Sequence, residues 1–150
     1  MKLAIGADHG GYVLKQEIAD FLSKIKNIDV TDHGTSGPES VDYPDFGKKV
    51  AEAVSNGTAD RGILICGTGI GMSIVANRYP KVRAALCQDL FTAKMSRLHN
   101  DANILVMGGR VVGAGLALEI VKTWIETPFE GGRHLRRLEK IAELTPSFKG

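Results

Sequence analysis

The stretch that decides the fold is Ile63-Leu64-Ile65-Cys66-Gly67-Thr68-Gly69-Ile70-Gly71. A short apolar run ends in a cysteine, a turn with alternating glycines follows at once, and a helical pattern begins at Met72. This order predicts a buried strand, a tight loop and the start of a helix. Glycines in such a loop leave backbone N–H groups free to face an anion, and the helix dipole adds positive potential. The segment therefore predicts a site for negative charge.

Cys66 lies where the predicted strand gives way to the loop. A cysteine beside the positive end of a helix is a usable base or nucleophile, because that field favours the thiolate. The opposing interpretation is that Cys66 fills space, as most free cysteines do. Cys87 is the internal comparison, since it ends a similar apolar segment without a glycine loop behind it, and we interpret it as structural. The loop sets Cys66 apart and favours chemistry in which a carbanion or enediolate forms.

The glycine spacing separates this loop from two common phosphate-binding motifs. It is G-x-G-x-G, whereas the dinucleotide motif is G-x-G-x-x-G, and the G-K-[ST] of a P-loop is missing. The loop also follows the third predicted strand rather than the first. A dinucleotide-dependent oxidoreductase is therefore a poor alternative.

Composition limits the class of protein. The 150 residues are 43% hydrophobic and 24% charged, which predicts one globular domain over residues 1–150. A formal charge of +2 without a basic run gives no reason to expect a nucleic-acid partner. The chain begins with a strand-like segment and shows no signal peptide or membrane span, and its two cysteines suit a reducing compartment. We therefore expect a cytoplasmic protein with no membrane contact.

Strand-like and helix-like segments alternate outward from the glycine loop. The predicted strands are about 2–7, 28–32, 63–66, 82–87 and 103–107, and the second is polar enough to be an edge strand. The predicted helices are about 13–25, 44–55, 72 onward, 90–99, 113–126 and 131–143. This alternation predicts an α/β fold of three α/β/α layers, Rossmann-like, with a five-stranded parallel sheet.

In such folds, ligands bind beyond the carboxyl ends of the strands. Polar residues follow several predicted strands, and we expect them to converge on one sheet edge together with the end of the fourth helix. They are Asp8, His9, His33, Asp42, Tyr43, Cys66, His99, Asn100 and Arg110.

These residues fall in blocks that closely resemble the B-type ribose-5-phosphate isomerases, within the ribose, galactose and allose phosphate isomerase family. The blocks run in family order from the first strand to the last helix. They are Asp8-His9, residues 39–45, Ile65 to Ser73, Ala76-Asn77-Arg78, Arg83 to Cys87, Ser96 to Asn103, and Gly131-Gly132-Arg133-His134.

The resemblance implies an aldose–ketose isomerisation through a cis-enediolate, without a metal or organic cofactor. Cys66 corresponds to the base that moves a proton between C2 and C1. Backbone N–H groups of Gly67, Gly69, Ile70 and Gly71 correspond to the anion hole. Thr68 would orient or relay a proton, and its alternative role is a hydroxyl that caps the helix.

His99 corresponds to the residue that opens the furanose ring. The resemblance assigns the sugar hydroxyls to Asp8, Asp42, Tyr43 and Asn100, and the phosphate to His9, Arg110, Arg133 and Arg137. Arg136 remains an alternative to Arg133, and ion pairing with Glu130, Glu139 and Glu143 is the simpler role for arginines on a charged helix. His33 and His134 are interpreted as surface or supporting residues.

The resemblance also implies that the C-terminal helix packs on a partner subunit, giving a homodimer with shared active sites; pairing of dimers into tetramers stays open. The expected substrate is ribose 5-phosphate, with galactose 6-phosphate and allose 6-phosphate as alternatives. A different class remains, a non-catalytic module that binds a phosphorylated metabolite. Such a module has no need of Cys66, Thr68 and His99 together.

Overall fold

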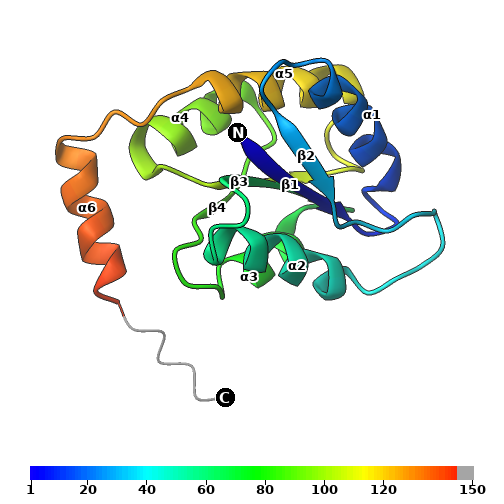
Figure 1. Ribbon diagram of the computed structural model, residues 1–150, viewed down its shortest axis with the longest axis horizontal. Coiled ribbons are helices and arrows are strands. Elements are labelled where there is room, and N and C mark those ends of the chain that lie inside the picture. Colours follow the sequence, from blue (N-terminus) through cyan, green and yellow to red (C-terminus); the bar gives the residue numbers. More distant parts are fainter. Residues whose placement is uncertain (145–150) are drawn as a thin grey trace.

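Strands and helices alternate along the chain, as the sequence predicts (Figure 1). The computed structural model describes residues 1–144, so the last six residues of the predicted domain lie outside it. The strands are β1 Lys2–Ala7, β2 Asp29–Asp32, β3 Arg61–Cys66, β4 Ala84–Leu86 and β5 Ile104–Gly108. The helices are α1 Tyr12–Ser23, α2 Tyr43–Ser55, α3 Ile70–Ala76, α4 Leu90–Asn100, α5 Ala114–Glu126 and α6 Arg133–Ala142.

Within this part of the chain, five parallel strands form one sheet in the order β2-β1-β3-β5-β4, which confirms the predicted sheet. The three inner strands carry almost uninterrupted apolar runs, because helices cover both of their faces. The polar strand β2 lies at one edge, as predicted. The fold is therefore a three-layer α/β/α arrangement.

Two apolar clusters hold the layers together. On one face, Leu14 and Ile18 of α1 and Trp124 of α5 pack on the sheet, and α4 packs beside α5. On the other face, Val50 of α2 and Met72 of α3 pack on it. Figure 1 shows α1, α4 and α5 on one side of the sheet and α2 and α3 on the other.

Strand β4 is shorter than the predicted segment 82–87. The N–H of Arg83 donates to the side-chain oxygen of Asn103 at 2.8 Å instead of to a neighbouring strand. The sheet pairing therefore begins only at Ala84, which lies opposite Ile104. None of the helices described is long and apolar enough to cross a lipid bilayer.

Helix α6 lies beside the end of α4, away from the two layers that cover the sheet (Figure 1). His134 is its one buried residue, whereas Leu135 and Ile141 remain 49% and 54% exposed. Leu138 and Ile141 line a cavity of about 440 Å³ that opens toward Ala84 and Ala85 of β4. The apolar side chains of α6 are thus only partly covered by their own chain.

A buried lysine fixes the loop between β2 and α2. The Nζ of Lys15 is within 2.6 Å of a carboxylate oxygen of Asp32 and donates to the carbonyl of Thr35 at 2.8 Å. Lys15 is 1% exposed, so both partners are needed to offset the desolvation of its charge. The lysine therefore holds the first part of the loop that leads to Asp42 and Tyr43.

Replacement of Lys15 by methionine is expected to lower the free energy of unfolding by about 1–3 kcal/mol, since the Thr35 carbonyl loses its buried donor. Water can reach the half-exposed Asp32, which limits the loss. Denaturant unfolding measures the effect, with the exposed Lys122→Met as control. Equal stability of the two variants would contradict this role.

Candidate active site

Three loops meet at the carboxyl edge of the sheet, after β1, β3 and β5. They pack backbone against backbone: a Cβ on Gly10 would lie 2.9 Å from the Gly67 nitrogen, and one on Gly109 would lie 2.5 Å from the Gly10 oxygen. The loops also share hydrogen bonds, from the N–H of Gly109 to the Cys66 carbonyl and from that of Arg110 to the Gly67 carbonyl. Only glycine permits such an approach, so the close packing fixes the floor of the site.

Cys66 lies at the centre of this floor, at the end of β3. Its sulfur accepts the N–H of Gly69 at 3.2 Å, and the residue is 5% exposed. Gly69 precedes α3 and has a φ of 82°, a left-handed conformation that favours glycine. The turn therefore aims a backbone donor at the sulfur, which gives a negative charge there a direct partner.

Thr68 serves the adjacent helix. Its hydroxyl oxygen accepts the N–H of Ile70 at 3.3 Å, at the start of α3. This contact is not the helix cap given above as the alternative role for Thr68, because the N-cap residue of α3 is Gly69 and the helix has no side-chain cap hydrogen bond. The hydroxyl proton is left to donate elsewhere, and the residue is exposed. The contact is therefore compatible with proton relay by Thr68.

Asp8 and His9 follow β1 at the same edge. Asp8 is 6% exposed, and its Oδ1 accepts the N–H groups of Gly10 and Gly11 at 2.9 and 3.2 Å. The Nδ1 of His9 accepts the N–H of Val41 at 3.2 Å, which ties the loop before α2 to this edge. In a neutral His9 the other nitrogen, Nε2, then carries the proton and can donate to a ligand.

Asp42 and Tyr43 begin α2 on the rim of the same site. Asp42 occupies the N-cap position, but its exposed carboxylate makes no cap hydrogen bond. The ring of Tyr43 lies against Gly71, where a Cβ would come within 2.7 Å of it. The Arg110 side chain, after β5, lies over Gly67: a Cβ on Gly67 would be within 3.7 Å of it. The structure thus brings the Tyr43 ring and the Arg110 guanidinium to the glycine loop.

His99 and Asn100 do not join this group within one chain. They end α4, which begins at the carboxyl edge and runs back to the amino edge, where β5 starts at Ile104. Eleven helical residues span about 16 Å, so His99 lies on the order of 15 Å from Cys66. The expectation that all of these residues converge on one sheet edge is therefore wrong for a single chain.

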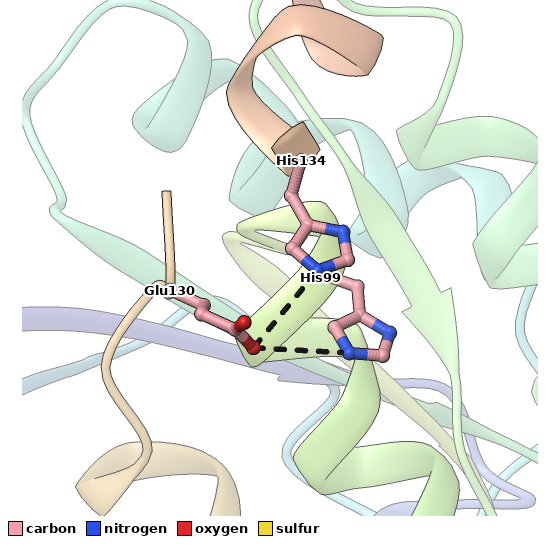
Figure 2. A group of neighbouring side chains, drawn as sticks. All are labelled: His99, Glu130 and His134. Atoms are coloured by element: carbon pink, nitrogen blue, oxygen red, sulfur yellow. Dashed lines mark ion pairs between the residues drawn. The ribbon is translucent and has the colours of Figure 1, made fainter. Parts of the chain in front are cut away.

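At the amino edge, His99 meets two residues near α6 (Figure 2). Its ring stacks on that of His134, with centroids 4.2 Å apart and an angle of 10° between the planes. The Oε2 atom of Glu130 lies 4.0 Å from Nε2 of His99 and 3.9 Å from Nε2 of His134. Sequence reasoning missed this cluster. The one signal was the four-residue spacing of Glu130 and His134.

His134 is 3% exposed, so of its two interpretations, as a surface or a supporting residue, the first is wrong. Burial lowers the pKa of His134, positive charge on His99 acts in the same direction, and the charge of Glu130 opposes both. Its Nε2 accepts the Nε–H of Arg133 at 3.4 Å. Arg133 and Arg137 are four residues apart on the exposed side of α6. They therefore lie near His99 and not near their own Cys66.

The comparison cysteine behaves differently. Cys87 is 1% exposed and packs in the core beneath α4 and α5. Burial raises the pKa of the Cys87 thiol, against the opposing effect of hydrogen bonds from Ser96 and Thr92. The core therefore disfavours a thiolate at Cys87.

Comparison with known proteins agrees with this architecture. Residues 3–141 match the Ribose/Galactose Isomerase family model. The solved structure of ribose-5-phosphate isomerase B from Clostridium thermocellum is 63% identical, covers 95% of this chain and 96% of its own, and superposes with a TM-score of 0.93.

Two curated relatives differ in the substrate that their names state. Ribose-5-phosphate isomerase B of Escherichia coli is 47% identical, with 95% of each chain covered. D-erythrulose-4-phosphate isomerase of Pectobacterium atrosepticum is 43% identical, with 94% of this chain and 93% of its own covered. With the family match over almost the whole chain, these likenesses show that the protein belongs to the ribose/galactose isomerase family, as an aldose–ketose isomerase of sugar phosphates.

Proposed function

We propose that this protein interconverts ribose 5-phosphate and ribulose 5-phosphate, with Cys66 as the base. The observation that carries the proposal is the Cys66 sulfur beneath a glycine loop, with the Gly69 N–H donated to it. The names of relatives that are 47% and 63% identical support the substrate. Family membership leaves no reason to retain the non-catalytic binding module or the dinucleotide oxidoreductase.

The proposed reaction moves two protons within the sugar, one from C2 to C1 and one from O2 to O1, and shifts the carbonyl bond from C1 to C2. The Cys66 thiolate takes the C2 proton of the open aldose, and the electrons of that C–H bond form the enediolate as the carbonyl bond opens onto oxygen. The protonated sulfur then returns the proton to C1. The N–H groups of Gly69 and Ile70 already donate to Cys66 and Thr68, so we assign the charge on oxygen to the other backbone N–H groups of the loop, those of Gly67 and Gly71. The Thr68 hydroxyl can carry the second proton between O2 and O1.

Ring opening needs a second acid–base group, which we assign to His99. Its distance from Cys66 in one chain means that the site is completed by His99 of the partner subunit. The exposed apolar residues of α6, Leu135 and Ile141, support a dimer in which this helix packs on the partner. The site would then combine the Cys66 loop of one chain with His99, Asn100 and the α6 arginines of the other. A cytoplasmic setting is part of the same proposal.

A coupled assay with a panel of sugar phosphates tests the substrate. We expect the highest kcat/KM for ribose 5-phosphate and lower values for allose 6-phosphate and galactose 6-phosphate. D-Erythrulose 4-phosphate is the second candidate, because a relative that is 43% identical is named for it. A larger kcat/KM for any of these three would replace the ribose assignment, and turnover of none of the panel would contradict the isomerase.

Replacement of Arg137 by alanine is expected to raise KM by about 10–100-fold with a smaller change in kcat. A charge-assisted contact with phosphate is worth about 1.5–3 kcal/mol, and the phosphate is bound equally in the ground and transition states. Lys140→Ala on the same helix is the control for loss of charge alone. Arg136→Ala, compared with Arg133→Ala, shows which of these two neighbours binds phosphate. A loss confined to kcat would contradict the assignment of Arg137.

A further inference from the structure

The cluster of His99, Glu130 and His134 has the donor set of a transition-metal site. Two imidazole nitrogens and one carboxylate are a common three-ligand set for zinc that leaves a fourth position open. One ligand atom from each residue lies within 4.8 Å of the other two. We propose that the cluster binds Zn²⁺ or a similar divalent ion, and that the ion inhibits the enzyme by holding His99. The inhibition rests on the proposed role of His99, whereas the binding does not.

The distances favour an ion over direct contact. Oε2 of Glu130 lies 4.0 Å and 3.9 Å from the two Nε2 atoms, too far for a hydrogen bond. In a tetrahedral zinc site with bonds near 2.0–2.1 Å, neighbouring ligand atoms are about 3.4 Å apart. The two distances from Glu130 must therefore shorten by roughly half an ångström, and the two imidazole nitrogens, which lie within 4.8 Å of each other, must approach by up to about 1.4 Å, to reach the spacing of a metal site.

The residues differ in how freely they can make this adjustment. His134 is almost fully buried and already presents Nε2 as an acceptor, to the Nε–H of Arg133. The His99 side chain is 38% exposed, on the last turn of α4. Because the two rings are stacked and their planes are nearly parallel, an ion cannot lie in both ring planes, and one ring must turn for both Nε2 atoms to bind it. We assign that turn to His99, and Glu130, 53% exposed, can follow it.

Arg133 competes with the ion. It donates to the same His134 nitrogen and adds positive charge next to the cluster. Binding of a cation therefore requires that this contact open. The consequence is specific: removal of the Arg133 side chain should strengthen metal binding, although the same change should weaken binding of a sugar phosphate.

An ion at this position would block ring opening without changing the base. A metal-bound Nε2 has no lone pair to accept a proton from the sugar, so opening of the furanose ring of the aldose phosphate is slowed. Proton exchange at C1 of ribulose 5-phosphate, which begins from an open ketose, needs Cys66 and not His99. Inhibition should therefore be larger for ribose 5-phosphate turnover than for this exchange.

Co²⁺ absorption spectroscopy on the intact, metal-free protein measures binding without reference to activity. We expect visible d–d bands at one ion per chain, without the sulfur-to-cobalt charge-transfer band that Cys66 or Cys87 would give. Glu130→Gln should weaken binding at least about tenfold. The exposed Glu139→Gln and the histidine variant His33→Asn should bind as the unchanged protein does, and Arg133→Ala should bind more tightly.

Activity at buffered free Zn²⁺ concentrations then tests the inhibition. Zn²⁺ should slow ribose 5-phosphate turnover about tenfold or more, with Glu130→Gln resistant relative to its own metal-free rate. Absence of Co²⁺ bands, a charge-transfer band, or equal inhibition of Glu130→Gln would each overturn the proposal. The chelator-treated enzyme shows whether isomerisation itself occurs, so failure of the proposed function is recognised separately.

Discussion

Cys66→Ala is expected to lower isomerase activity by about 10²–10⁴-fold or more, because removal of a positioned general base costs on this order. The proposed role of Cys66 is supported by one contact, the Gly69 N–H that donates to its sulfur. The fold should be unaffected, as alanine at the end of β3 removes only one buried atom. Steady-state rates with ribose 5-phosphate, together with circular dichroism, make the comparison.

Cys87→Ala is the matched control. It removes the same atom from the core near α4 and α5, where burial disfavours a thiolate. This variant should lose some stability through a small cavity and keep its activity. Turnover by Cys66→Ala within a few fold of the unchanged enzyme would remove Cys66 from the mechanism, whatever the result at Cys87.

Mixing two inactive variants is expected to restore activity. In a dimer that shares its sites, a Cys66→Ala chain and a His99→Asn chain together form one site with both defects and one with neither. After complete subunit exchange, half of the dimers are mixed and each has one intact site. The recovered activity should then be about a quarter of that of the unchanged dimer.

The physical basis is the path of α4, which carries His99 to the amino edge of the sheet while Cys66 stays at the carboxyl edge. Mass spectrometry of chains with different tags verifies the exchange, so that a lack of activity can be interpreted. If mixed dimers form and remain inactive, either His99 serves the same site as Cys66 of its own chain or it has no catalytic role. A second mixture, of Cys66→Ala with Arg133→Ala/Arg137→Ala, asks the same question of α6.

The sequence predicts the sheet well because its signals are local. Alternating apolar runs and amphipathic segments identify all five strands, and the polar sequence of residues 29–32 identifies an edge. The length of β4 could not be predicted, because the N–H of Arg83 donates to the side chain of Asn103, twenty residues away. The periodicity of apolar residues gives no sign of such a contact.

The site was predicted in its parts but not in its arrangement. Residues that directly follow strands, such as Asp8 and Cys66, are placed correctly because parallel strands share one carboxyl edge. His99 follows a helix, and a helix between parallel strands returns to the opposite edge, a rule that could have been applied. The burial of Lys15 depends on Asp32, 17 residues away, and that of His134 depends on the ring of His99, which lies on another helix. Neither contact can be read from the local sequence pattern.

The glycines that join the three loops have a consequence for how this enzyme can change. At Gly10 and Gly109 any side-chain atom would clash with the backbone of a neighbouring loop, so neither position offers a side chain to exchange for a larger or smaller one. Adaptation to a shorter or longer sugar must then come from the rim, in the segment before Asp42 and Tyr43 or on α6. Libraries directed at those two segments should yield new specificities, while libraries directed at the loop junction should yield mainly unfolded chains.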